Sequence, residues 1–155
     1  MKIPVSTYRI QLIPDLDFKR LTDICSYLSA LGIGGIYASP VFSSRPGSKS
    51  GYDITSYDSL DRLLGNLDDL CRAAAAAWDH GIYWIQDIVP NHMALDTANA
   101  MLMDVLEFGK VSRYSRFFDI DLDHPGLEDR LLIPLLGKDY DRCLEDGEIN
   151  IIFTE

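Results

Sequence analysis

Two polar strings in the sequence carry residue types that could bind or transform a substrate. The first is Asp87-Ile88-Val89-Pro90-Asn91-His92, where a carboxylate, an amide and an imidazole lie close together. A carboxylate at the end of a buried strand needs a partner, because burying an unpaired charge is costly. Pro90 fixes the direction in which the chain leaves that strand. Taken alone, the string fits either a loop of caps and hydrogen bonds or a set of ligands for a hydroxyl-rich substrate.

The second string is Gly51-Tyr52-Asp53-Ile54-Thr55-Ser56-Tyr57, in which an aromatic ring stands beside a carboxylate. This pair suits a sugar, whose C–H faces stack on rings and whose hydroxyls bond to charged acceptors. The alternative is a tyrosine that covers the core and an aspartate that starts a turn. The residue types alone leave both interpretations open.

Hydrophobic periodicity predicts the elements that position these strings. Alternation predicts strands with period two, and apolar residues at helical spacing predict helices. We place an N-cap of the first helix at Asp15 or Asp17 and its C-terminal stop at Gly32. The predicted elements are strands at 6–13, 33–39 and 82–89, helices at 21–31 and 66–80, and a polar loop at 43–59.

The second part of the chain is less regular. We expect a helix at 98–108, a strand at 117–123, and short apolar or strand-like runs at 131–136 and 148–153. The change of character separates residues 1–95, a unit of alternating strands and helices, from the less regular residues 96–155.

Strands that alternate with helices predict an α/β fold with parallel strands. An open doubly wound sheet and a (β/α)₈ barrel both fit, and in either one ligands bind at the carboxyl ends of the strands. The dinucleotide fingerprint would favour the open sheet, but Gly32-Ile33-Gly34-Gly35 lies before or inside a strand and Tyr37 takes the place of the third glycine. We therefore interpret these glycines as a helix stop and a site of close strand packing.

Composition limits the classes of binding partner and the cellular compartment that the sequence predicts. The net charge of −10 and the scattered basic residues argue against a nucleic-acid partner. No apolar run is long enough for a membrane span, so no membrane partner is predicted. The three cysteines, Cys25, Cys71 and Cys143, form neither a disulfide framework nor a metal-binding pair, which favours a reduced, cytoplasmic setting. No cofactor and no metal are predicted.

The two strings together, in this order and each just past a strand, resemble the α-amylase superfamily, glycoside hydrolase family 13. DIVPNH (87–92) resembles the first signature region of that superfamily. Further segments resemble one of its branches, the maltooligosyltrehalose synthases: TYRIQL (7–12), YLSALGIGGIYASPVF (27–42), RPGS (45–48), GYDIT (51–55), DIVPNHMA (87–94), DVLEFG (104–109), FFDID (117–121), LLIPLLG (131–137) and GEI (147–149).

This resemblance implies a (β/α)₈ barrel with a small insertion after strand three. The chain would supply strands one to three with their helices and the start of the insertion. The implied activity is an isomerisation that converts the reducing-end α-1,4 bond of a maltooligosaccharide into an α,α-1,1 bond, a step of trehalose biosynthesis.

Residue by residue, the resemblance implies a substrate-binding set of Tyr52, Asp53 and His92. His92 would hydrogen-bond the glucose in subsite −1, Tyr52 would stack under the same glucose, and Asp53 would make a polar contact near it. Four further positions match supporting residues. Asp87 would brace an arginine near the nucleophile, Asn91 stands where many amylases have a calcium ligand, and Arg9 and Gln11 would line the barrel.

The retaining mechanism of the superfamily needs an Asp nucleophile and a Glu acid/base. The resemblance places both beyond residue 155, so no catalytic residue is assigned and the chain alone is expected to be inactive. The alternatives are a non-catalytic glucan-binding or interaction remnant, and one half of a split barrel completed by a separate C-terminal half-barrel chain. Three strands alone would also expose strand edges and an apolar sheet face.

Local departures separate the sequence from the synthase pattern. Gly34-Gly35 replaces the usual Ser-His or Thr-His, and Ser50 replaces a histidine that would contact substrate. Asp61-Arg62-Leu63-Leu64-Gly65 replaces an Asn-Pro-Glu-Leu-Gly run, and Leu122 replaces a tryptophan. These changes fit either a divergent subfamily or a chain released from selection for catalysis.

Overall fold

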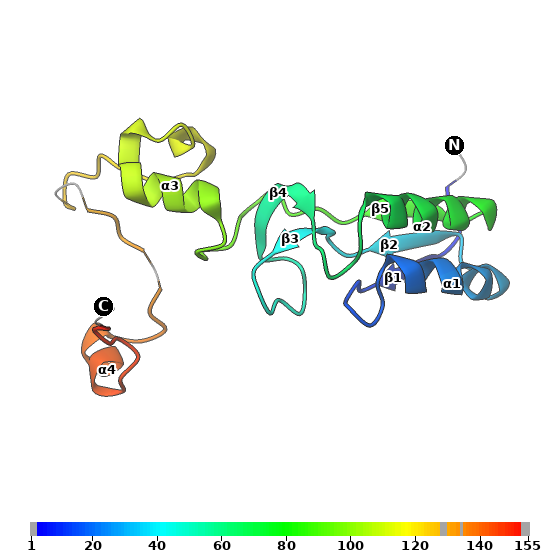
Figure 1. Cartoon of the computed structure of the whole chain (residues 1–155), viewed down its shortest axis with the longest axis horizontal. Helices are drawn as coiled ribbons and strands as arrows, with labels where there is room; N and C mark the ends of the chain where they lie inside the picture. Colours follow the sequence, from blue (N-terminus) through cyan, green and yellow to red (C-terminus); the bar gives the residue numbers. More distant parts are fainter. Residues whose placement is uncertain (1–2, 128–129, 134, 153–155) are drawn as a thin grey trace.

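The computed structural model describes residues 3–127, 130–133 and 135–152, and the molecule is elongated (Figure 1). A sheet with two helices forms one end, a β-hairpin lies in the middle, and the remaining helices lie at the other end. The chain therefore begins with an ordered α/β unit and continues into a looser second part.

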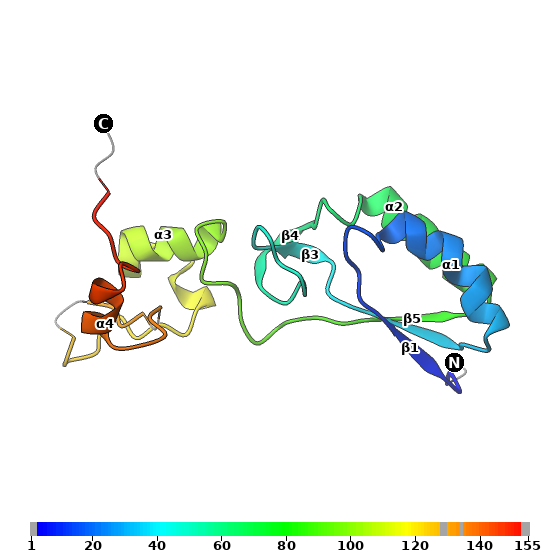
Figure 2. The same cartoon turned by 90° about the horizontal axis from the view of Figure 1, so that it is seen from below.

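The first unit is a parallel three-stranded sheet in the order β1-β2-β5. Its strands are β1 (Thr7–Ile10), β2 (Gly35–Ala38) and β5 (Tyr83–Gln86). The connecting helices α1 (Phe18–Ala30) and α2 (Leu67–Asp79) pack against each other on the same face of the sheet (Figure 2). Crossovers between parallel strands are right-handed, so strands added in one direction place their helices on one face. This is the winding of a (β/α)₈ barrel, whereas a doubly wound sheet carries helices on both faces.

Local caps explain where the two helices begin. The Asp17 carboxylate accepts a hydrogen bond from the Arg20 backbone N–H at 2.8 Å and caps α1. Asn66 and Asp69 form a reciprocal capping box at the start of α2, which satisfies two backbone N–H groups. Gly32 follows α1 with a φ of 84°, the left-handed conformation expected of a glycine just after a helix. The predicted start at Asp17 and stop at Gly32 are confirmed.

The hydrophobic core lies between the sheet and the two helices. Its buried side chains come from β1, α1, β2 and α2 and from the segments next to these elements: Ile10, Leu12, Phe18, Leu21, Cys25, Leu28, Ile36, Ala38, Val41, Leu64, Ala73, Ala77 and Ile82. Trp84 of β5 packs against them and is partly buried. The opposite sheet face is uncovered, with Tyr37 36% and Ile85 41% exposed. The expectation of an exposed face on a three-strand unit is confirmed.

An antiparallel hairpin occupies much of the segment predicted as a loop. Its strands are β3 (Phe42–Ser44) and β4 (Ile54–Leu60), which pair from Phe42↔Leu60 to Ser44↔Ile54 with register shifts between. The predicted loop at 43–59 is therefore wrong at both ends. Its high serine content resembles loop composition, but Ser43 also bonds across the hairpin to the Ser59 hydroxyl at 2.9 Å. Serine side chains here stabilise strand pairing.

The second part holds helix α3 (Ala100–Phe108), two 3₁₀ turns, η1 (Gly109–Val111) and η2 (Ser115–Phe117), and helix α4 (Tyr140–Glu145). The predicted helix at 98–108 is confirmed. The predicted strand at 117–123 is wrong: η2 overlaps its start, and Asp121 accepts a bond from the Asp123 backbone N–H at 3.0 Å in a turn.

The other predicted strand-like runs also differ from the structure. Residues 131–133, 135–136 and 148–152 form no strand. Positions 134 and 153 of those predicted runs lie outside the described residues. Helix α4 was not predicted. Within the portion of the chain that the structure describes, no helix combines the length and apolar character needed to cross a bilayer.

Candidate functional site

The candidate site is a cluster at the carboxyl ends of the parallel strands. Arg9 comes from β1, Asp87 follows β5, and Tyr52 comes from the loop between β3 and β4. Arg9 Nη1 donates to Asp87 Oδ2 at 3.0 Å, and Arg9 Nη2 donates to the Tyr52 hydroxyl at 2.9 Å. The Tyr52 hydroxyl donates in turn to Asp87 Oδ2. Three side chains that are far apart in sequence thus form a closed triangle.

Gln11 links this triangle to the loop that carries Tyr52. Its Oε1 accepts a hydrogen bond from Arg9 Nη2 at 3.3 Å, and its Nε2 donates to the Ser50 backbone carbonyl at 2.9 Å. The turn after β1 is itself fixed, because the Leu12 backbone N–H donates to the buried Ser39 hydroxyl at 2.8 Å. Gln11 therefore fixes the approach of the loop to the sheet.

Tyr37 supports the cluster from the sheet and was missed by the sequence analysis. The Arg9 guanidinium carbon lies 4.7 Å from the centre of the Tyr37 ring and 5.9 Å from that of the Tyr52 ring. In the parallel register Arg9 pairs with Tyr37, and Tyr37 pairs with Ile85, so the three occupy one row across the sheet. A cation held over aromatic rings is attracted by their π electrons. The alternation of GIYA could have placed Tyr37 on the Arg9 face.

The hydrogen bonds of the triangle set its protonation state. The Tyr52 hydroxyl, followed by Arg9, lowers the pKa of Asp87 although burial opposes this change. The hydrogen bond to Asp87 and burial raise the pKa of Tyr52, and Asp87 raises the pKa of Arg9. Near neutral pH the cluster holds an aspartate, a neutral phenol and a guanidinium. Because Asp87 already accepts two hydrogen bonds, the geometry suits it to holding Tyr52 and Arg9 in place. The arginine that contacts Asp87 here is Arg9, and the role of bracing an arginine near the nucleophile stays a prediction.

The Asp53 carboxylate forms its side-chain hydrogen bonds within its own loop. Its Oδ2 accepts from Arg45 Nε at 2.6 Å, and its Oδ1 accepts from the Ser48 hydroxyl. Burial raises the pKa of Asp53, but the bonds from Ser48 and Arg45 lower it by more, so the net pKa lies below its usual value. The structure gives Asp53 a loop-holding role, and its contact with a sugar stays a prediction.

Asn91 and His92 lie apart from the triangle. Both are exposed, and Asn91 Nδ2 lies 3.2 Å from His92 Nδ1. Their backbone is held by Tyr57, whose hydroxyl donates to the Val89 carbonyl and to the His92 carbonyl, the latter at 3.3 Å. Burial raises the pKa of Tyr57. His92 lines a pocket of about 360 Å³ between the hairpin and the segment around η2.

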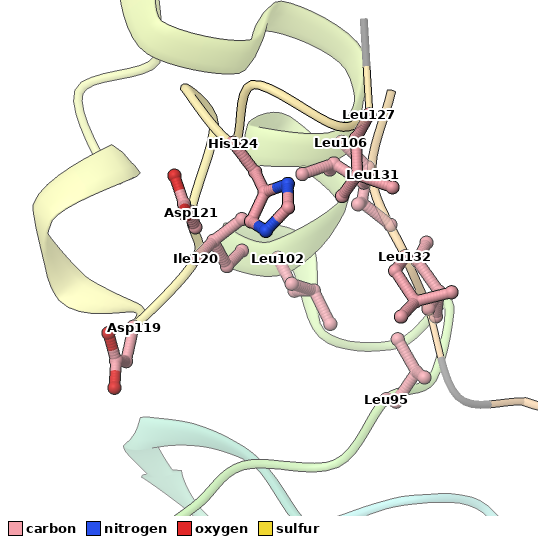
Figure 3. Close-up of a pocket in the computed structure, with 11 residues that line it drawn as sticks. Leu95, Leu102, Leu106, Asp119, Ile120, Asp121, His124, Leu127, Leu131 and Leu132 are labelled. Atoms are coloured by element: carbon pink, nitrogen blue, oxygen red, sulfur yellow. The ribbon is translucent and has the colours of Figure 1, made fainter. Parts of the chain in front are cut away.

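A larger cavity of about 480 Å³ lies in the second part of the chain (Figure 3). Leucine side chains dominate its lining, including Leu102, Leu106 and Leu132. Asp119, Asp121 and His124 supply its polar groups. Binding sites combine an apolar lining with a few convergent polar groups, and here the polar set is sparse and separate from the Arg9 cluster. Among residues 3–127, 130–133 and 135–152, no group of three or more His, Cys, Asp or Glu side chains is placed to hold a metal ion.

Comparison with known proteins agrees with this geometry. Residues 15–125 match the model of the α-amylase catalytic domain. This chain belongs to the α-amylase family. The match covers α1, β2, the hairpin, α2, β5 and α3, and thus contains Tyr52, Asp87 and His92.

Relatives of this α-amylase-family chain include maltooligosyl trehalose synthases. A Mycobacterium tuberculosis (strain CDC 1551 / Oshkosh) protein assigned as such a synthase is 39% identical over 149 residues, which cover 91% of this chain and 19% of the relative. The solved maltooligosyltrehalose synthase from Arthrobacter ramosus is 37% identical, with a TM-score of 0.80 over 90% of this chain and 18% of that one. Another solved maltooligosyl trehalose synthase gives 37% identity and a TM-score of 0.81 over 97% and 20%. The chain thus spans about a fifth of the length of these relatives.

Proposed function

We propose that this chain forms the part of a maltooligosyltrehalose synthase that holds the substrate glucose next to the bond being rearranged. The observation that carries the proposal is the Arg9–Tyr52–Asp87 triangle at the carboxyl edge of the parallel sheet. In α/β barrels that edge is where substrates bind. The 39% identity to a protein assigned as a synthase supports the same substrate class, a maltooligosaccharide.

In this proposal each site residue has one role in binding. The ring of Tyr52 stacks under the glucose, because its hydroxyl is already used by Arg9 and Asp87 and the ring face away from Arg9 is the part left for a ligand. His92 bonds a glucose hydroxyl. Asn91, which lies beside His92, orients its ring. The reaction is an intramolecular transfer: the α-1,4 bond breaks, and the released sugar is rejoined through an α,α-1,1 bond.

We assign neither Asp53 nor Asp87 as nucleophile or acid. Each carboxylate accepts hydrogen bonds from two side chains, so attack on a sugar would break a satisfied network. A retaining pair of carboxylates is expected from later barrel strands, as the family resemblance implies. The isomerase activity therefore belongs to the complete barrel in this proposal.

The uncovered sheet face supports the proposal that further protein structure packs against this unit. Tyr37 and Ile85 point away from α1 and α2, and an apolar face of this kind is normally covered. We propose that further barrel strands cover it, supplied either by the same polypeptide or by a separate half-barrel chain. We place the boundary between the barrel and the inserted segment at residues 95 and 96. The three free cysteines support a cytoplasmic location.

A binding and turnover experiment tests this proposal. The purified chain is titrated calorimetrically with maltopentaose, with cellopentaose as a β-linked control, and trehalose-type products are assayed on the same sample. Binding of maltopentaose without turnover is expected. Turnover would contradict the assignment of the catalytic carboxylates to other strands, and an absence of maltopentaose binding would contradict the glucan-binding role of this chain.

A further inference from the structure

The segment that carries His92 connects the sheet to the second part of the chain. Residues 87–99 run from β5 to α3 and contain no helix or strand, so their course depends on the contacts that hold them (Figure 2). Tyr57 holds the backbone at His92. A second contact follows two residues later, where the Ala94 backbone N–H donates to the Ile54 carbonyl at 2.7 Å. The connecting segment is therefore tied to β4 at two points.

The bond between Ala94 and Ile54 lies close to both proposed glucose contacts. Ala94 is two residues after His92, and Ile54, which is completely buried, is two residues after Tyr52. A shift of Ala94 away from Ile54 would therefore change the separation of the Tyr52 ring and the His92 imidazole. The groups of a binding site must be held within about 0.5 Å of the productive geometry. Whatever fixes Ala94 thus affects the site.

Asn99 fixes Ala94 from the side of α3. Its side chain is completely buried, and its Nδ2 donates to the Ala94 carbonyl at 3.0 Å. Its Oδ1 accepts a hydrogen bond from the Leu102 backbone N–H at 3.2 Å and caps α3. A helix cap uses only the side-chain oxygen, so the amide nitrogen serves the bond to Ala94. Asn99 therefore joins the start of α3 to the segment that carries His92.

We propose that Asn99 is a positioning residue for the glucan site. Through Ala94 and Ile54 it keeps the segment of His92 against the start of β4, and so sets the separation of His92 and Tyr52. The inference rests on the proposed function, because it takes His92 and Tyr52 as the glucose contacts. Asn99 itself touches no sugar. Loss of its donor lowers the fraction of chains in which both contacts are in place, and the apparent affinity falls by the same factor.

Asn99→Ser separates the bond to Ala94 from the helix cap. Serine is as good an N-cap as asparagine, but its hydroxyl lies one bond nearer the backbone than Nδ2 and should not reach the Ala94 carbonyl. The matched control is Asn66→Ser, the same change at the cap of α2. Amide hydrogen exchange of Ala94 and Leu102 is measured by NMR, and maltopentaose affinity by calorimetry, in the wild-type chain and in both variants.

We expect Asn99→Ser to speed exchange of the Ala94 N–H and to leave exchange of the Leu102 N–H unchanged. Maltopentaose binding should weaken about three- to tenfold, the range that one hydrogen bond contributes to an equilibrium. Asn66→Ser should keep wild-type values of Ala94 exchange and of affinity. Asn99→Asp keeps the size of the side chain and the cap but lacks the donor, so it should show the same changes without the space that serine leaves.

Three results would overturn the inference while leaving the proposed function intact. The first is unchanged Ala94 exchange in Asn99→Ser, and the second is unchanged affinity despite faster exchange. The third is an equal loss of protection at Leu102, because Asn99 would then act only through the stability of α3. Failure of the wild-type chain to bind maltopentaose would overturn the proposed function, and the exchange of Ala94 would still show whether Asn99 holds this segment.

Discussion

The guanidinium of Arg9 is the point at which the sheet, the Tyr52 loop and Asp87 meet, so its replacement tests the geometry of the site. Arg9→Met removes the bonds to Asp87 and Tyr52 and leaves the Asp87 carboxylate with one donor. A hydrogen bond to a charged group contributes roughly 1.5–3 kcal/mol, and an exposed ion pair about 0.2–1 kcal/mol. The Arg9 and Asp87 side chains are 36% and 13% exposed, which places the loss between these ranges, at about 1–2 kcal/mol.

The assay is thermal unfolding followed by tryptophan fluorescence, to which Trp84 in β5 contributes, with Arg62→Met as a control on an exposed turn. Each kcal/mol corresponds to a fall in melting temperature of roughly 2–4 °C for a chain of this size. Arg9→Lys should lose nearly as much as Arg9→Met, because an ammonium cannot reproduce the planar fork that serves Asp87 and Tyr52 together. Full rescue by Arg9→Lys, or no loss in Arg9→Met, would refute the reasoning.

Three further predictions follow from single contacts. The folded pKa of Asp87 lies below its unfolded value near 4. Its stabilisation is therefore complete above the unfolded value and is lost as pH falls through the folded pKa. Asp87→Asn should flatten the fall in unfolding free energy below about pH 4, and an unchanged acid slope would refute this. Asn66→Ala removes the cap of α2 and should cost about 1 kcal/mol in thermal unfolding, and an unchanged melting temperature would count against the capping box. Asp53→Asn should loosen its loop and speed trypsin cleavage after Lys49, whereas an equal cleavage rate would remove the loop-holding role.

The barrel-like unit could be predicted because its elements are periodic in sequence. Alternation marked β1, and apolar spacing with local caps marked α1 and α2, so the order of strands and helices followed directly. The hairpin was missed because serine and glycine are typical of loops, and only the pairing of 54–60 with 42–44 makes it a strand. The run at 117–123 alternates, but alternation yields a strand only where another strand is there to pair with it.

The sequence predicted which residues form the candidate site, but only some of the contacts between them. Arg9, Tyr52 and Asp87 were singled out, and the structure joins them. Tyr37 was missed because parallel register, which places it beside Arg9, cannot be read from one strand. The bonds of Asp53 to Arg45 and Ser48 depend on how the loop folds back, which composition does not encode.

The central claim is that this chain binds an α-glucan through Tyr52, and one comparison tests it most directly. Maltopentaose is titrated into the wild-type chain, into Tyr52→Ala and into Tyr27→Ala, which removes an exposed ring on α1 away from the site. The account predicts binding by the wild-type chain and by Tyr27→Ala, and a loss of about tenfold or more in Tyr52→Ala. Equal affinities in all three chains, or no binding by the wild-type chain, would contradict it.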